Sequence, residues 1–179
     1  MKAVRIPKER VGALIGKDGA SKRMLQERMQ MTIRVDTEGE VFIEDENTKD
    51  PVMSLKAVDI IKAIGRGFSP ERALRLMGED EYLEVMDIDD YVGKRHDQLS
   101  RMRARVIGSG GKTRRIIEDM CGVDLSVYGD TVAIIGNSIQ LPIGRSAVDM
   151  VLSGSEHATV YRYLERKRAT LKIMEMGFE

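Results

Sequence analysis

The chain has little sulfur chemistry and few aromatic side chains. Cys121 is the only cysteine among 179 residues, tryptophan is absent, and there are only five tyrosines and three phenylalanines. A single cysteine excludes an internal disulfide bond and a zinc site built from several thiolates. With so few aromatic rings, the core must be built mainly from aliphatic side chains, and we expect Cys121 to lie in it.

Long apolar runs are also missing. No stretch of about 18 apolar residues is present to cross a bilayer, and the opening segment, MKAVRIPKER, contains no apolar core of signal-peptide length. We therefore expect a cytoplasmic protein that makes no membrane contact. His96 and His157 have no carboxylate or cysteine at metal-binding spacing, so we expect surface or capping roles for them, with no catalytic residue and no metal.

Neither sign of charge is in excess, because 29 lysines and arginines balance 29 aspartates and glutamates. A net charge of zero at first argues against a nucleic-acid partner. The distribution is uneven, however: basic residues are concentrated in 1–35 and 94–115, and acidic residues in 36–50 and 79–90. Each basic block surrounds a glycine-rich segment. Judged on charge alone, solvated helix faces explain these blocks as well as a binding surface does.

The second glycine-rich segment, VIGSGGKTRRIIE at 106–118, resembles the phosphate loop of a nucleotide triphosphatase. Such a loop needs a further glycine five positions before Gly111, followed by lysine and threonine. That position holds Val106. The spacing therefore disfavours a phosphate-handling enzyme, and we expect no catalysis, no cofactor and no small-molecule substrate.

The same segment is one copy of an internal repeat. LIGKDGASKRMLQERMQMTIRV (14–35) aligns without a gap on VIGSGGKTRRIIEDMCGVDLSV (106–127). The two copies share an apolar pair, two outer glycines, a basic pair, a second apolar pair and a short alternating apolar run. One module has therefore been used twice.

Local patterns predict the same order of elements in each copy. Strands are expected at KAVRI (2–6) and YLEVMDI (82–88), each followed by a helix that ends at the first loop glycine. A second helix, a β-hairpin and a closing helix follow. We place the closing helices at about 50–64, with Asp50 as N-cap and Pro51 in the first turn, and at 142–152, opening with Pro142.

The order strand, helix, helix, strand, strand, helix predicts an α+β fold for each copy, with a three-stranded antiparallel sheet packed on helices. The predicted domains are 1–78, including a linker helix at SPERALRLM, and 79–154, followed by a helical tail at 155–179. In the tail, Ser155 is the expected N-cap, and an apolar stripe should pack on one or both domains. The stripe consists of Val160, Leu164, Leu171 and Met174. The opposite face, with Arg162, Arg166, Lys167 and Arg168, either extends a binding surface or keeps the helix soluble.

Each copy resembles a KH domain of the strand-first type (type I), whose mark is an apolar residue and isoleucine before G-x-x-G, then a basic and apolar helix. The loops IGKDG and IGSGG keep this pattern, and the resemblance covers about four fifths of the chain. It implies binding of single-stranded RNA, because a KH loop clamps the backbone of about four nucleotides while the bases face an apolar groove.

The residues implied as the RNA site fall into loop residues, cations and apolar groove residues. Glycine allows close approach of the backbone, a helix N-terminus favours phosphate, and cations add salt-dependent attraction. Core packing is the alternative explanation for the apolar members. The first copy supplies Gly16, Lys17, Asp18, Gly19, Lys22 and Arg23, with Ile15, Ile33 and Val35 as groove floor; the second supplies Gly108, Ser109, Gly110, Gly111, Lys112, Arg114 and Arg115, with Ile107, Leu125 and Val127.

Asp18 departs from the pattern, because a carboxylate at the loop tip repels the phosphates that the loop should attract. Ser109 and Gly110 carry no such charge. We therefore expect direct RNA binding chiefly in the second copy, with the first binding weakly or serving as a scaffold.

The pair of KH units, with its acidic linker and helical tail, resembles the archaeal relatives of the partner-of-Nob (Pno and Dim type) proteins, which are similar to the Krr-type factors. This resemblance implies a small-subunit ribosome assembly factor that binds near the 3′ end of the small-subunit rRNA. It also implies the Nob endonuclease and the alpha subunit of initiation factor two as partners. The alternatives are a KH-fold protein-interaction adaptor and a general RNA-binding or RNA-decay accessory subunit.

Overall fold

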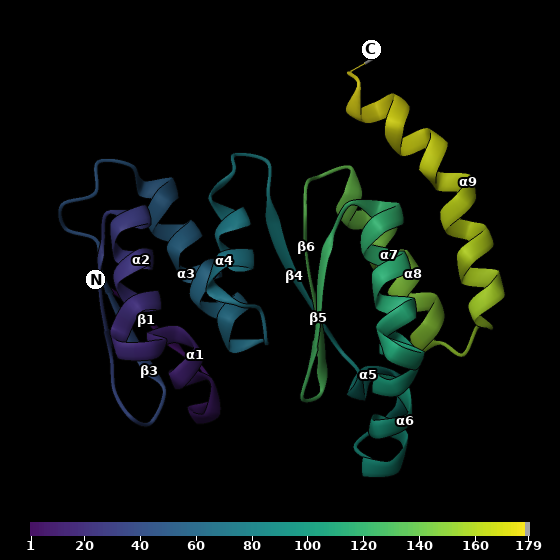
Figure 1. The fold of residues 1–179 in the computed structure, drawn as a ribbon, viewed down its shortest axis with the longest axis horizontal. Coiled ribbons are helices and arrows are strands. Elements are labelled where there is room, and N and C mark those ends of the chain that lie inside the picture. Colours follow the sequence, from purple (N-terminus) through teal and green to yellow (C-terminus); the bar gives the residue numbers. More distant parts are fainter. Residues whose placement is uncertain (178–179) are drawn as a thin grey trace. The chain divides into compact units, whose positions relative to one another are not determined.

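The computed structural model describes residues 1–177, so the last two positions of the predicted tail, 178–179, lie outside the described residues. The chain divides into two compact units, the first formed by residues 1–79 and the second beginning at residue 80 (Figure 1). No helix of the described part is long and apolar enough to span a membrane.

The first unit contains three strands, four α-helices and three short 3-10 helices. In chain order these are β1 (Lys2–Arg5), η1 (Lys8–Arg10), α1 (Val11–Ile15), η2 (Lys17–Gly19), α2 (Ala20–Met29), β2 (Thr32–Val35), β3 (Glu40–Glu44), α3 (Pro51–Gly65), α4 (Pro70–Ala73) and η3 (Leu74–Met77).

The second unit repeats the order strand, helix, loop turn, helix, two strands and helix, with a short α-helix in the place of η1 and one long helix in the place of α4 and η3. Its elements are β4 (Tyr82–Asp87), α5 (Asp89–Val92), α6 (His96–Ile107), η4 (Ser109–Gly111), α7 (Lys112–Cys121), β5 (Asp124–Tyr128), β6 (Thr131–Gly136), α8 (Gln140–Leu152) and α9 (His157–Glu175).

Each unit holds one three-stranded antiparallel sheet, in the orders β1-β3-β2 and β4-β6-β5. The last strand of each unit, β3 or β6, is central in its sheet. It pairs with its hairpin partner on one side and with the first strand of the unit on the other. Register places inward-facing apolar residues opposite each other, such as Ile33 and Ile43 in the first sheet. The predicted α+β class, with helices packed on three-stranded antiparallel sheets, is confirmed.

The cores are aliphatic, as the scarcity of aromatic residues predicts. In the second unit, Val106, Ile117 and Ile134 are fully buried in one cluster, and Val160 and Leu164 of α9 belong to the same cluster. The tail helix therefore packs one apolar face against the second unit, while most of its other residues are exposed. Cys121, with 2% of its surface exposed, lies in this cluster as predicted.

Several predicted helix ends are correct and two are not. The Asp50 side chain accepts a hydrogen bond from the Val52 N–H at 2.9 Å and caps α3, as expected. In contrast, α8 begins at Gln140 rather than at Pro142, because the Asn137 side chain accepts from the Gln140 N–H at 2.8 Å and starts the helix earlier.

The tail helix also differs from its prediction. It begins at His157 without a side-chain cap from Ser155, whose carbonyl oxygen instead accepts a hydrogen bond from Arg105. Leu171 is buried as predicted, but Met174 is 48% exposed. The last turn of α9 contacts its own unit through a polar group instead, since Nε2 of Gln140 donates to Oε1 of Glu175 at 2.8 Å.

Candidate nucleic-acid interface

The two G-x-x-G loops have nearly the same backbone. In both, the preceding helix ends at a glycine with positive φ, 74° at Gly16 and 76° at Gly108. The third loop position is left-handed in both copies, with φ of 55° at Asp18 and 61° at Gly110. Aspartate is among the few residues that tolerate this region. The first loop therefore keeps its shape while carrying a charge.

The first glycine of each loop is required by the helix that follows it. A Cβ atom on Gly16 would lie 2.8 Å from the backbone nitrogen of Ser21, and one on Gly108 would lie 2.6 Å from that of Thr113. These distances are shorter than any ordinary carbon contact, and backbone cannot move aside. The two glycines are thus fixed by internal packing, in addition to the close phosphate approach that the sequence suggests.

An arginine folds back over each loop. The Nη1 atom of Arg23 donates to the carbonyl oxygen of Asp18 at 2.7 Å, and that of Arg115 donates to the carbonyl oxygen of Gly110 at 2.8 Å. The repeat alignment matches these arginines but gives no sign that they hold the loop. Their role as braces of the third loop carbonyl comes from the structure alone.

The predicted cations differ in exposure. Lys17, Arg23, Lys112 and Arg115 are exposed, whereas Lys22 and Arg114 are half-buried. The Nε atom of Arg114 lies 3.8 Å from a carboxylate oxygen of Glu118.

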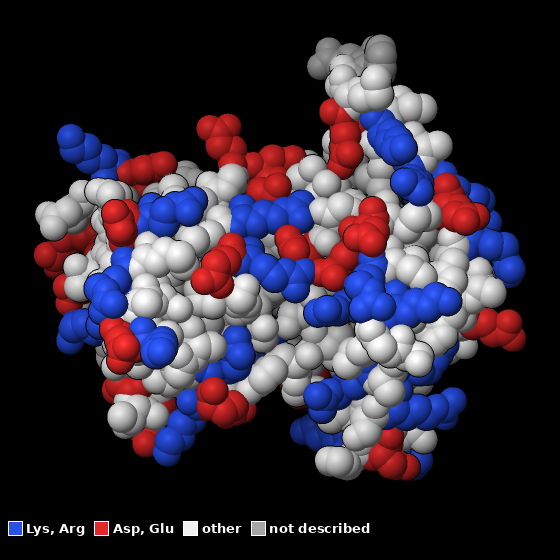
Figure 2. Space-filling view, in the orientation of Figure 1, with Lys and Arg blue, Asp and Glu red and all other residues white. Residues whose placement is uncertain are grey.

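Further cations, Arg101, Arg103 and Arg105, lie on α6 before the second loop. In Figure 2, lysine and arginine side chains gather over the end of the second unit that holds α6.

Of the predicted groove residues, four retain exposed surface and two do not. Ile15, Val35, Ile107 and Val127 are half-buried and can contact a base. The other two, Ile33 and Leu125, have 0% exposed surface, so they belong to the core and cannot line a groove. Their inward position follows from the strand alternation that places them against the helices.

A polar side chain ties the edge strand to the loop helix in each unit. The backbone N–H of Ile33 donates to Oε1 of Gln26 at 2.8 Å, and that of Leu125 donates to Oε2 of Glu118 at 3.0 Å. Gln26 and Glu118 occupy equivalent repeat positions, and sequence reasoning missed them. The repeat alignment could have identified them, because it places a long polar side chain at the same position of both helices, directly after a buried apolar residue.

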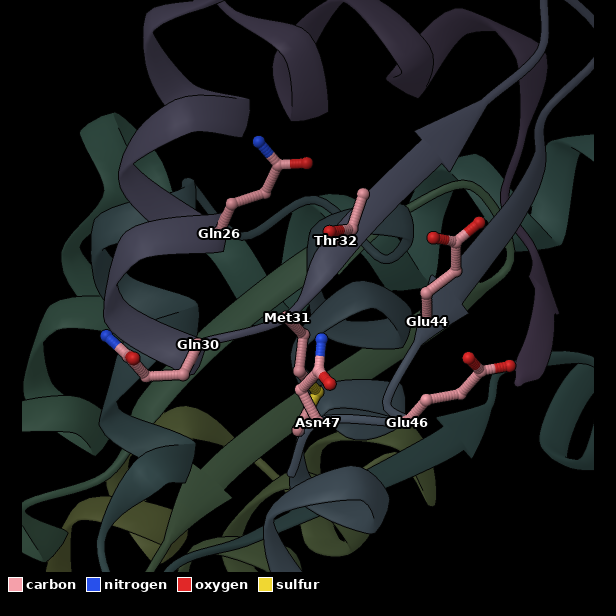
Figure 3. Close-up of a pocket in the computed structure, with 7 residues that line it drawn as sticks. All are labelled: Gln26, Gln30, Met31, Thr32, Glu44, Glu46 and Asn47. Atoms are coloured by element: carbon pink, nitrogen blue, oxygen red, sulfur yellow. The ribbon is translucent and has the colours of Figure 1, made fainter. Parts of the chain in front are cut away.

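The first unit has a polar cavity of about 380 Å³ at the far end of α2 from its loop. Figure 3 shows Gln26 on α2 and Gln30 just after its end, with two carboxylates, Glu44 and Glu46, on the opposite side. The Nε atom of Arg34 pairs with Glu44 at 2.7 Å, so one of these charges is partly balanced.

The remaining reactive side chains have structural roles. Burial raises the pKa of the Cys121 thiol to about 12, which makes it a poor nucleophile. The Nε2 atom of His157 lies 3.0 Å from the carbonyl oxygen of Arg105. Within residues 1–177, no group of three or more histidine, cysteine, aspartate or glutamate side chains is placed to hold a metal ion.

Two like-shaped loops on two α+β units define a protein with two tandem KH domains. Comparison with known families agrees: residues 82–169 match a model described as eukaryotic type KH-domain (KH-domain type I), and residues 2–52 match the KH domain model.

Relatives identify the family more closely. The chain is 45% identical to a KH domain-containing protein of Methanocaldococcus jannaschii, covering 94% of this chain and 74% of the relative. It is 29% identical to the pre-rRNA-processing protein Pno1 of Schizosaccharomyces pombe, covering 83% of this chain but only 63% of that protein. The chain belongs to the family of tandem KH-domain proteins that includes Pno1 and the archaeal Dim2p proteins.

Solved structures support the same assignment. The crystal structure of Dim2p from Pyrococcus horikoshii is similar with a TM-score of 0.86 and 50% identity, covering 92% of this chain and 98% of that one. A complex of a/eIF2alpha, aDim2p and rRNA from the same organism matches with a TM-score of 0.88 and 49% identity, covering 95% and 94% of the two chains.

Proposed function

We propose that this protein binds single-stranded RNA through its second KH loop and acts as a small-subunit ribosome assembly factor near the 3′ end of the rRNA. Support comes from the loop geometry and from the relatives, one of which is named a pre-rRNA-processing protein and another of which is seen in a complex with rRNA. In this proposal the protein assists the maturation of that RNA by binding it and does not itself catalyse a reaction.

The second loop provides the parts that a KH clamp needs. Phosphates approach the backbone of Gly108–Gly111 at the N-terminus of α7, where the positive end of the helix dipole favours anions. The exposed Lys112 ammonium adds attraction, and Arg115 keeps the loop carbonyl turned away by binding it. The bases then face the half-buried Ile107 and Val127.

The observation that carries this proposal is the contrast at the third loop position. Asp18 and Gly110 share one backbone conformation, so the loops differ there in charge rather than in shape. The first unit is therefore assigned a secondary role, as a weak RNA site or a scaffold. The Nob endonuclease and the alpha subunit of initiation factor two are the proposed protein partners, the latter because a similar protein forms a complex containing that factor.

A substitution at the third position of the second loop tests the RNA function. Gly110→Asp gives the second loop the charge of the first, and Gly110→Asn is its neutral control, since both residues tolerate the left-handed region. We expect Gly110→Asp to weaken binding at least about fivefold, because like charges about 4 Å apart repel by about 1 kcal/mol even in bulk water. The asparagine variant should stay within about twofold of the wild type.

The measurement is a competition titration at near-physiological salt. A labelled single-stranded RNA matching the small-subunit rRNA 3′ end competes with scrambled RNA and with duplex DNA. Equal losses in both variants would show that backbone strain rather than charge causes the effect. Absence of RNA binding in the wild type would reject the proposed function and favour the protein-interaction adaptor.

A further inference from the structure

The C-terminal helix contacts the residue that packs behind the second loop. The hydroxyl of Tyr161, on α9, lies 3.0 Å from Oγ1 of Thr113, at the start of α7. Thr113 is only 2% exposed, and its backbone lies so close to Gly108 that a Cβ atom there would have no room. Tyr161 therefore contacts Thr113, the residue against which Gly108 packs.

The chain before the loop is tied to the same region. Nε2 of His157 lies 3.0 Å from the carbonyl oxygen of Arg105, and the His157 ring stacks on Tyr161 at a centroid distance of 6.1 Å. The Arg105 guanidinium in turn donates to the carbonyl oxygens of Val151, at 2.6 Å, and Ser155. Both flanks of the second loop, at Arg105 and at Thr113, are thus fastened to one segment, 151–161.

The first unit has only part of this arrangement. Arg10 donates to the carbonyl oxygens of Ile64 and Phe68, at 2.8 and 3.0 Å, and so matches the role of Arg105. Ser21 takes the place of Thr113, but within residues 1–177 no side chain hydrogen-bonds its hydroxyl. The loop of the second unit is therefore held from behind by a helix that the first unit lacks.

We propose that α9 positions the second KH loop for RNA, with Tyr161 as the central positioning residue and His157 supporting it. This role rests on the proposed function and extends it to a helix outside the repeated module. A loop that is already ordered loses less conformational entropy when phosphates bind, so preorganisation raises affinity without any new contact to the ligand.

The test compares Tyr161→Phe with Tyr163→Phe. Tyr163 lies on the same helix and is also half-buried, but its ring packs near Lys167 and no hydrogen bond of its hydroxyl occurs within the described part of the chain. Tyr161→Phe should weaken binding of the 3′-end RNA about three- to tenfold, in keeping with the net worth of one hydrogen bond. Tyr163→Phe should bind like the wild type.

Hydrogen exchange in the free protein gives a readout that does not depend on RNA. The N–H groups of Gly108 and Gly111 donate to Ala104 and Gly108 carbonyl oxygens, so their exchange reports order in the loop. We expect faster exchange in Tyr161→Phe and in Thr113→Val, with no further change when the two are combined, since they break the same bond. Thr113→Ser, which keeps the hydroxyl, should restore both exchange and affinity.

The two proposals fail in different ways. A wild type that binds none of the RNAs would overturn the proposed function. A wild type that binds, together with a Tyr161→Phe variant of unchanged affinity and unchanged loop exchange, would overturn the positioning role alone. Equal losses in Tyr161→Phe and Tyr163→Phe would also overturn it, by showing a general effect of altering α9.

Discussion

At the scale of single residues, the two KH loops differ at only a few positions. The copies share the two outer glycines and the arginine that binds the third loop carbonyl, and they differ most sharply where the first has Asp18 and the second has Gly110. Because both positions are left-handed, the two loops differ in charge there while having the same shape. The proposed division of labour between the units rests on that difference and on the Thr113–Tyr161 contact, which only the second unit has.

Cys121 gives a prediction about pH at the same scale. Burial raises its pKa from the ordinary value of 9.0 to about 12. Between these values the unfolded chain releases the thiol proton while the folded chain keeps it, so stability is lost as pH rises above about 9. We expect the thermal midpoint to fall over this range, and to fall less in Cys121→Ala. Parallel declines in the two proteins would assign the effect to other groups.

At the scale of elements, each loop packs so closely on the helix that follows it that only glycine fits at the first loop position. Gly108→Ala would place a Cβ atom 2.6 Å from the Thr113 nitrogen in a left-handed residue. We expect it to destabilise the protein by about 1–3 kcal/mol, in the range of backbone strain at such positions. Denaturant unfolding followed by circular dichroism measures this.

Gly12 provides the matched control for that prediction. It lies inside α1, and an added Cβ would meet no atom within 4 Å. Gly12→Ala should therefore stabilise the protein by about 0.5–1 kcal/mol through higher helix propensity. If Gly108→Ala proved as harmless as Gly12→Ala, the tight packing of loop on helix would be wrong.

At the scale of the whole molecule, net charge is a poor guide to partners. The total is zero, yet basic residues gather around the second loop and on α6. If the loop clamps about four nucleotides, the logarithm of the binding constant should fall with the logarithm of salt concentration with a slope of about −3, at about −0.7 for each phosphate. Titrations at several salt concentrations measure the slope.

A pair of charge variants tests which cations contribute to that salt dependence. Lys112→Gln removes an exposed cation at the start of α7 and should make the slope shallower by about 0.7 if the ammonium contacts one phosphate. Lys172→Gln makes the same change in the last turns of α9 and should leave the slope unaltered. A slope near zero in the wild type would contradict phosphate recognition altogether.

The sequence by itself determined the repeated module, the two G-x-x-G loops, the hairpins and the cap of α3 by Asp50, because each depends on signals within a few neighbouring residues. It failed at the start of α8, where the Asn137 side chain begins the helix, and at Met174 near the end of α9, which is exposed. Local patterns carry no information about which neighbours a side chain will meet.

Only the tertiary structure decided which candidate residues can reach RNA. The packing of the helices on each sheet places Ile33 and Leu125 out of reach in the core and leaves Ile107 and Val127 partly open. It also joined Tyr161 to Thr113 and Arg105 to Ser155, pairs that are far apart in sequence. Contacts between distant segments arise only when the apolar faces of several elements are buried together, and no local pattern encodes them.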